Sequence, residues 1–290
     1  MVVRMGADWQ AVEAALGSGV RSHRPLGGSG WTDVRHVTLA DGREVVVKFA
    51  SRLDLRIEAR MLGVLRERSG LPTPRVEHAA EGVLVLEFVQ ERGGVDARVE
   101  RHAAELIASL HGVVSADGRY GLEFDGLIGA LPQPNGWCAS WPEFFAAQRL
   151  APMVARAEGA LSSGCVKALG RLMGNLGELV PERPRASLLH GDIWAGNVLA
   201  RDGKVAAFID PATYYGHAEV ELAFIELFGT FGAGFFEAYA SGAGWSASER
   251  REYARTRRSV YQVYPLLVHA ALFGGGYGAQ VEGVLRQLGV

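Results

Sequence analysis

The first ninety residues alternate between helical and strand-like patterns. Residues 8–16 carry apolar side chains at helical spacing, which predicts a short helix. Apolar and polar side chains then alternate on both sides of Asp41 and Gly42, a pair typical of a tight turn between antiparallel strands. An amphipathic helix over 56–68 and a strand over 82–89 follow. This part of the chain is therefore predicted to form a small sheet with two helices.

Beyond about residue 90 the pattern becomes mainly helical. Apolar side chains recur at helical spacing over 97–113, 141–161, 165–180 and 246–273. A short strand is predicted over 205–210. We therefore predict an α+β protein with a small β-rich lobe over 1–90, a larger helical lobe over 91–290, and a cleft between them near 87–94.

Composition narrows the class of protein. With 48% hydrophobic and 21% charged residues among 290, the chain can bury a large core. A formal net charge of −2 lacks the basic excess of nucleic-acid-binding proteins, so no such partner is expected. Two cysteines are too few for a disulfide framework, and we find neither a signal peptide nor the ~18 consecutive apolar residues of a membrane span. We expect a soluble, cytoplasmic protein; the sequence carries no signal for its oligomeric state.

Lysine is rare in this chain: of 30 basic residues, three are lysines and 27 are arginines. Lys48 lies in the apolar segment VVVKFA, where a buried ammonium needs an anion close by. An exposed position on an edge strand would explain Lys48 alone equally well. Two features favour an anion site. Glu58 on the next helix can pair with the ammonium, and Gly27, Gly28 and Gly30 can let backbone N–H groups approach phosphates.

The segment LLHGDIWAGNVLA carries the strongest chemical signal. Asp192 is followed five positions later by Asn197, and Asp210 ends the predicted strand 13 positions after that. Carboxylate and amide oxygens suit Mg²⁺, which takes one or two carboxylates besides substrate phosphates. One Asp then remains free as a base. A structural loop capped by Asp192 is the alternative, but the upstream lysine and glutamate favour a catalytic site.

This order of residues resembles that of protein-kinase-like phosphotransferases. Protein kinases carry H-R-D with an Asn five positions after the Asp, followed by D-F-G. Here Gly191 replaces the Arg, while Asp210, Pro211 and Ala212 replace D-F-G. The missing Arg argues against control by a phosphorylated activation loop, and the missing Phe removes the usual packing switch. The resemblance therefore implies the bilobal protein-kinase-like fold and favours a small-molecule kinase.

The chain more closely resembles the fructosamine kinase (ketosamine-3-kinase) family, from about residue 20 to 290. It carries H-G-D-x-W-x-G-N at 190–197, D-P-A-x-Y-Y-G-H at 210–217, and the segments PNGWCASWPEFFAAQRL and YPLLVHAALFGGGY. The resemblance implies ATP- and Mg²⁺-dependent phosphorylation of the 3-hydroxyl of a ketosamine, whose amine is free or belongs to a protein lysine. It also implies repair of glycation, because the phosphorylated adduct is unstable and falls away.

The resemblance assigns a role to each polar residue of the site. Asp192 would orient the sugar hydroxyl and accept its proton. Asn197 and Asp210 would hold Mg²⁺ on the phosphates. Lys48, positioned by Glu58, would neutralise phosphate charge.

Trp194, two residues beyond the base, is expected to lie against the sugar, although a buried Trp that anchors the loop would also fit. His217 and Glu219 could reach the substrate amine or brace the loop, and neither role is favoured. Glu221 is expected to cap the backbone of the catalytic loop from a helix.

The segment Glu87, Phe88 and Val89 is expected to contact adenine through its backbone, which suits ATP and GTP alike. Two competing functions remain. One is a phosphotransferase for an aminoglycoside or a choline-type amino alcohol. The other is a catalytically inert, kinase-like binding module, which the presence of the lysine, the base and the metal ligands disfavours.

Overall fold

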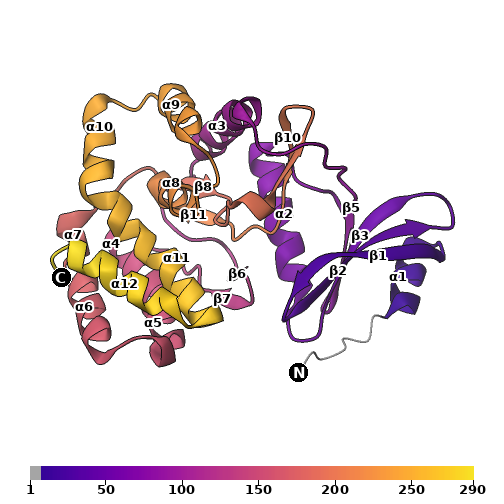
Figure 1. Ribbon diagram of the computed structural model, residues 1–290, viewed down its shortest axis with the longest axis horizontal. Coiled ribbons are helices and arrows are strands. Elements are labelled where there is room, and N and C mark those ends of the chain that lie inside the picture. The colour runs from indigo at the N-terminus through magenta and orange to yellow at the C-terminus, as the bar shows by residue number, and fades with distance from the viewer. Residues whose placement is uncertain (1–7) are drawn as a thin grey trace.

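The computed structural model describes residues 8–290 and has two lobes of unequal size (Figure 1). The smaller lobe consists of α1 (Trp9–Leu16), β1 (Val20–Ser29), β2 (Thr32–Leu39), β3 (Glu44–Ala50), α2 (Leu55–Ser69), β4 (Val76–Ala80) and β5 (Val83–Glu87). Its strands form one antiparallel sheet in the order β1-β2-β3-β5-β4. The predicted turn between β2 and β3 is confirmed, with Gly42 at a φ of 88° that suits glycine.

The two faces of β3 explain why a lysine can lie in an apolar strand. Successive side chains of a strand point to opposite faces of the sheet. Val45, Val47 and Phe49 pack on one face together with Val12 of α1. Lys48 therefore faces the other side, toward α2, which Figure 1 shows between the sheet and the larger lobe.

The larger lobe is mainly helical, as predicted. Its helices are α3 (Ala97–Gly112), α4 (Trp141–Phe144), α5 (Ala151–Arg156), α6 (Ser163–Gly174), α7 (Leu176–Leu179), α8 (Ala218–Leu227), α9 (Ala233–Gly242), α10 (Ala247–Glu252), α11 (Arg258–Phe273) and α12 (Gly276–Gln287). Three strand pairs complete it: β6 (Gly126–Ile128) with β7 (Leu131–Gln133), β8 (Ser187–Leu189) with β11 (Tyr214–Gly216), and β9 (Val198–Arg201) with β10 (Lys204–Phe208).

The long helix predicted over 246–273 is interrupted. A π-helical turn, Tyr253–Arg257, separates α10 from α11, and a second one, Phe145–Leu150, follows α4. The extra residue of a π turn rotates the side chains that follow it, and periodicity alone does not reveal it. The interruption directs Arg257 into the lobe, where it becomes part of a buried network described below.

The segment after β5 joins the lobes. It runs beside β9, where the N–H of Arg92 donates to the carbonyl of Ala200 at 2.8 Å. It ends at Asp96, which caps α3 by accepting from the N–H groups of Arg98 and Val99. Most of the core lies in the larger lobe, around the fully buried Trp141. None of the helices in residues 8–290 has both the length and the apolar character needed to cross a membrane.

Candidate active site

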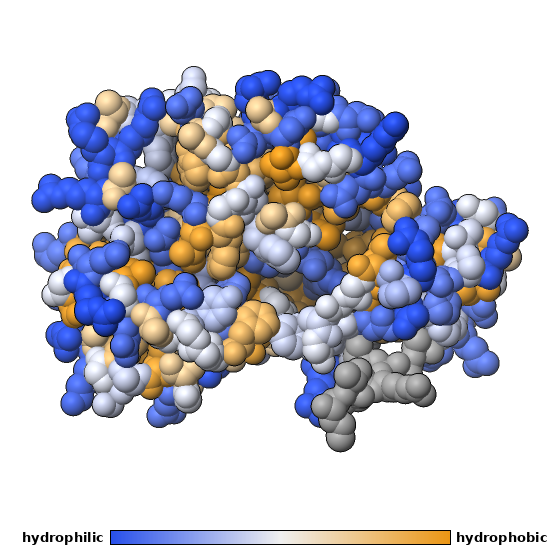
Figure 2. All heavy atoms as spheres, viewed as in Figure 1, coloured by the Kyte–Doolittle hydropathy of each residue, from blue (hydrophilic) through white to orange (hydrophobic). Residues whose placement is uncertain are grey.

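A cleft of about 1020 Å³ lies between the two lobes, and Figure 2 shows the surface hollowed there. Most of the predicted site residues line it: Gly27, Gly28, Lys48, Glu58, Glu87, Phe88, Val89, Asp192, Trp194, Asn197 and Asp210. Gly30 lies in the turn that joins β1 and β2, while His217 and Glu219 lie within the larger lobe, away from the lining.

Lys48 connects the two lobes across the cleft. Its Nζ donates to both carboxylate oxygens of Glu58 at 2.9 Å and to Oδ1 of Asp210, 162 positions away, at 2.8 Å. Lys48 is only 6% exposed. Burial alone would lower the pKa of its ammonium, but the charges of Glu58 and Asp210 raise that pKa above the usual range. The site thus holds a permanent cation at the floor of the cleft.

The loop that carries Asp192 is shaped by Gly191. Its φ is 88°, and a Cβ at this position would lie 2.2 Å from the carbonyl oxygen of Ala212. Only glycine fits such a close approach. The loop after β8 and the loop after Asp210 are therefore packed against each other, which places Asp192 beside Asp210.

A buried chain of hydrogen bonds holds this loop from below. The N–H of Gly191 donates to Oε1 of Glu221 at 2.5 Å, so the predicted capping by Glu221 is confirmed. The other carboxylate oxygen accepts from Nε2 of His111 at 2.9 Å, and Nδ1 of His111 lies 2.8 Å from the hydroxyl of Tyr239. Because a carboxylate can only accept, Nε2 carries the proton and Nδ1 accepts from Tyr239. Nothing in the local sequence marked His111 or Tyr239 as partners of the loop.

Asp192 and Asn197 contact each other directly. The amide nitrogen of Asn197 donates to the backbone carbonyl of Asp192 at 2.8 Å and to its Oδ2 at 3.1 Å. Burial, together with the nearby charge of Asp210, raises the pKa of Asp192 to about 8. A carboxyl group with a raised pKa, half-buried in a cleft, is typical of a group that exchanges a proton during a reaction.

Asp210 and Asn197 offer the oxygen atoms that Mg²⁺ prefers. The N–H of Ile209 donates to the carbonyl of Asn197 at 3.1 Å, which ties the two positions together. Asn197 uses its amide nitrogen for Asp192, which leaves the amide oxygen available. Asp210 has a φ of 54°, uncommon for a residue with a Cβ, and its side chain is 44% exposed to the cleft. The donor set therefore fits a magnesium ion that completes its shell with phosphate oxygens and water.

The glycine-rich turn between β1 and β2 covers one side of the cleft. Gly28 has a φ of 141°, and a Cβ there would lie 2.4 Å from the carbonyl oxygen of Thr32. This glycine is needed because the two strands approach closely, a reason that sequence alone did not supply. Gly27 also has a positive φ, of 156°, with open space around it.

The predicted hinge follows β5. The N–H of Glu87 donates to the carbonyl of Arg75 at 2.9 Å, so it is already used in the smaller lobe. The side chain of Phe88 packs on His36, with ring centroids 4.1 Å apart. The N–H of Glu87 is therefore already used, and Phe88 and Val89 are the hinge residues beyond β5 that line the cleft.

Trp194 lies at the cleft with 47% of its surface exposed. Its indole ring covers Gly196, where a Cβ would come within 2.3 Å of a ring atom. The side chain therefore lies flat against its own loop and presents a face to the cleft. This geometry favours the substrate-facing prediction over a buried anchor.

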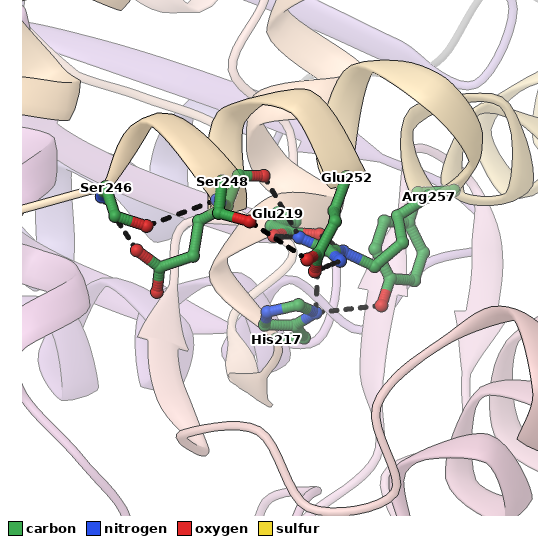
Figure 3. A network of polar contacts seen from close by, with 8 residues as sticks. His217, Glu219, Ser246, Ser248, Glu252 and Arg257 are labelled. Carbon is green, nitrogen blue, oxygen red and sulfur yellow. Dashed lines mark hydrogen bonds and ion pairs between the residues drawn. The ribbon is translucent and has the colours of Figure 1, made fainter.

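His217 and Glu219 belong to a different network, which Figure 3 shows beneath α10 and the π turn. Glu219 receives two hydrogen bonds from the guanidinium of Arg257, at 2.6 and 2.7 Å. Nδ1 of His217 lies 2.8 Å from the hydroxyl of Tyr261, which also accepts from Nε1 of Trp141 at 3.0 Å. Burial and the charge of Arg257 lower the pKa of His217 to about 3, so its ring is neutral.

The orientation of His217 and Glu219 decides between the two roles considered for them. The first turn of α8 points into the larger lobe, so neither side chain faces the cleft. Of the two roles considered for them, the geometry favours bracing over contact with the substrate amine. The partner Arg257 was not foreseen, because it lies 38 positions beyond Glu219 in a turn that looked helical.

A second unforeseen support lies behind the Asp210 loop. The amide nitrogen of Gln133 donates to the carbonyl of Ala212 at 2.9 Å, and the hydroxyl of Tyr264 donates to the amide oxygen of Gln133 at 2.8 Å. Both side chains are buried. The β6–β7 pair and α11 thereby fix the loop that follows the proposed metal ligand.

Comparison with known proteins gives a consistent picture. The sequence profile of the fructosamine kinase family matches residues 10–289. A probable ketoamine kinase of Synechocystis is 36% identical over 211 residues, which cover 72% of this chain and 68% of that protein. The chloroplastic protein-ribulosamine 3-kinase of Arabidopsis thaliana is 29% identical, with 79% of this chain and 70% of that protein covered.

Solved structures agree with the sequence comparisons. A crystal structure from Thermobifida fusca assigned as a fructosamine-3-kinase superposes with a TM-score of 0.86 at 31% identity, covering 98% of this chain and 99% of that one. An aminoglycoside phosphotransferase superposes with a TM-score of 0.65 at 18% identity, covering 97% of both chains. The second likeness concerns the fold alone, and it confirms the predicted protein-kinase-like architecture.

Proposed function

Since this chain belongs to the fructosamine kinase family, and is thus an ATP-dependent phosphotransferase, we propose that it phosphorylates the 3-hydroxyl of ketosamines. The amine of the substrate would be free or the side chain of a glycated protein lysine. Relatives named for ketoamine and protein-bound ribulosamine substrates support this choice. The proposed role is removal of sugar adducts from amines, in the cytoplasm.

One observation carries the proposal: a lysine, a protonatable Asp and an Asn–Asp pair, predicted from separate parts of the sequence, meet in one cleft. Phosphoryl transfer depends mainly on positioning and on stabilisation of charge. Asp192 would accept the proton of the attacking hydroxyl. Lys48 would move from Asp210 toward the phosphates, because the phosphates and the Asp210 carboxylate compete for the same ammonium.

Magnesium fits this arrangement. Asp210 and Asn197 would hold the ion, which supplies positive charge next to the transferring phosphate. The fixed φ of Asp210 and the tie between Ile209 and Asn197 would orient both ligands before nucleotide arrives. Trp194 would offer its exposed ring to the apolar face of the sugar.

Two alternatives are less well supported. A fold shared with an aminoglycoside phosphotransferase at 18% identity carries no substrate information. A catalytically inert binding module is disfavoured because Lys48, Asp192, Asn197 and Asp210 are all present and close together.

A substrate panel tests the proposal. Purified protein with Mg²⁺ and labelled ATP is offered fructose-lysine, ribulose-lysine, a glycated protein, an aminoglycoside and an amino alcohol. Phosphorylation of a ketosamine, with the phosphate assigned to the 3-position by NMR, is the expected result. The Asp192→Asn variant serves as the blank, because it keeps the shape of the site and removes the base. Turnover of the aminoglycoside without turnover of any ketosamine would overturn the proposed substrate.

A further inference from the structure

The two lobes also meet at an aromatic contact outside the polar centre. Trp31, in the glycine-rich turn, lies with its ring centroid 6.2 Å from that of Phe273, the last residue of α11, at an interplanar angle of 30°. Trp31 lines the cleft, whereas Phe273 is 58% exposed, more than any other large apolar residue in the part of the chain described. Figure 1 places the end of α11 opposite the β1–β2 turn.

The two partners differ in how firmly they are held. Phe273 sits on an aromatic cluster, with ring centroids 5.6 Å from His269 and 6.4 Å from Tyr277. His269 in turn lies 4.7 Å from the ring of Phe228. The position of Phe273 at the end of α11 is therefore held by its packing on neighbouring aromatic rings.

The other side is a turn at the exposed end of the paired β1–β2 hairpin. Nine of the ten residues of β1, from Arg21 to Ser29, are exposed, and the turn is closed by polar contacts between Ser29 and Thr32. Gly27 and Gly30 flank the turn with open space where a side chain would stand. Phe273 is thus held by packing within the larger lobe, whereas Trp31 lies on an exposed hairpin turn. A change in the position of this turn would make or break their contact.

The contact bridges the two lobes beside the cleft, because Trp31 lines it. The turn between β6 and β7 reaches the same place, because a Cβ on Gly129 would lie 3.2 Å from Cδ1 of Leu272. Gly129, Trp31 and Trp194 all line the cleft. Asp192, where a sugar hydroxyl would be placed, lines the same cleft.

We propose that Trp31 and Phe273 form a clasp between the lobes that holds the glycine-rich turn down over the transferring phosphate and must open for substrates to exchange. They are positioning residues that act through the turn. The retention of nucleotide by the clasp follows from the fold and the ATP-dependent activity. Its effect on sugar transfer rests on the proposed function.

A double-mutant cycle tests the clasp with Mg²⁺ and a fluorescent AMP-PNP analogue, which needs no sugar. Trp31→Ala and Phe273→Ala should each raise the dissociation rate of the analogue roughly two- to tenfold, the range expected for one aromatic pair. The double variant should be no faster than the faster single variant, because both changes remove the same contact. Multiplication of the two single effects, or unchanged rates, would overturn the proposal.

Two further variants separate the clasp from general damage. Trp31→Phe keeps an aromatic ring in the turn and should stay within about twofold of the unmodified protein, whereas a rate as fast as that of Trp31→Ala contradicts the contact. Val166→Ala removes an apolar side chain that is 37% exposed on α6, away from the cleft, and should change nothing. Unfolding temperatures of all variants establish that they are folded.

The sugar-dependent readout is the number of ATP molecules hydrolysed per ketosamine phosphorylated. It should rise in both single variants, because a lifted turn admits water to the phosphate. If the unmodified protein phosphorylates no ketosamine, the proposed function fails while the dissociation rates still decide the fate of the clasp.

Discussion

Two ion-pair networks in this protein each pair a buried cation with carboxylates, but only one of them lies at the cleft. Lys48 bonds to one carboxylate from each lobe, and one of them, Asp210, has a side chain that is 44% exposed to the cleft. Arg257 bonds to both oxygens of Glu219, with side chains only 11% and 5% exposed, and both belong to the larger lobe.

The difference shows what makes a buried charge useful for chemistry. In the cleft, an incoming phosphate can replace Asp210 as the partner of Lys48, because solvent already reaches that carboxylate. Arg257 bonds to Glu219 in a bidentate geometry, and its second partner, Glu252 at 3.1 Å, is 62% exposed but does not line the cleft. We infer that a partner exposed to the cleft, rather than charge, burial or exposure as such, separates the reactive network from the structural one.

In the cleft, the largest effect on activity is expected from removal of the proposed base, Asp192. Asp192→Ala should lower kcat by roughly 10²–10⁴-fold, the usual range for removal of a general base. Nucleotide affinity should stay close to that of the unmodified protein, because the side chain bonds to Asn197 and not to Lys48. Steady-state kinetics and calorimetric titration with Mg²⁺ and AMP-PNP measure the two quantities. Near-normal turnover in the folded variant would end the assignment of Asp192.

In the network of Glu219 and Arg257, the largest expected effect is on the free energy of unfolding. Arg257→Met leaves Glu219 buried without its cation, and removal of one partner of a buried pair costs about 3–5 kcal/mol of unfolding free energy. Activity per folded molecule should change little, because the network lies outside the cleft.

The adjacent residue provides a matched control. Arg258 pairs with Glu226 at 2.8 Å, but their side chains are 37% and 34% exposed. Arg258→Met should therefore cost no more than about 1 kcal/mol. Urea denaturation of both variants makes the comparison, and equal losses would contradict the contrast between the buried and the exposed pair.

At the proposed metal site, loss of one negative charge should by itself weaken the affinity for Mg²⁺. Asp210→Asn removes one negative charge and keeps the shape, so the Mg²⁺ concentration at half-maximal activity should rise at least about tenfold, the lower end of what loss of a supporting residue costs in metal affinity. Asp202→Asn is the control, since Asp202 is an exposed aspartate with a similar φ of 53°. An unchanged titration in Asp210→Asn would move the metal site elsewhere.

The smallest expected effect concerns Trp194. Trp194→Ala should raise the KM for the ketosamine roughly two- to tenfold and also lower kcat, because the ring both holds and orients the sugar. Trp194→Phe should keep most of the activity. A matched rise in the KM for Mg·ATP would mean that Trp194 supports the loop and Asn197 rather than the substrate.

The sequence predicted those parts of the site whose geometry follows from local pattern. Alternation in β3 allowed Lys48 to face inward, and the spacing of Asp192 and Asn197 within one loop brought them into contact. Glu221 was expected under the loop because a helix follows the Asp210 segment closely. In each case a short stretch of chain and its periodicity determine where the side chain points.

Prediction stopped where orientation depends on distant segments. His217 and Glu219 lie near the loop in sequence, but spacing does not tell which way the first turn of α8 faces. Their partner Arg257 ends a π turn that apolar periodicity had concealed, and their partner Tyr261 follows that turn on α11. His111 likewise reaches Glu221 across 110 positions, a contact that only the packing of α3 against the rest of the lobe establishes.

The scarcity of lysine has a consequence for the chemistry this protein would encounter. Reducing sugars attack unprotonated amines, and the chain offers only Lys167 and Lys204 as exposed lysine side chains. Lys48, the one lysine that the site needs, is buried and kept as an ammonium by its two carboxylates. A protein that handles glycated amines thus shields its own indispensable amine from the same damage by keeping it protonated and out of reach.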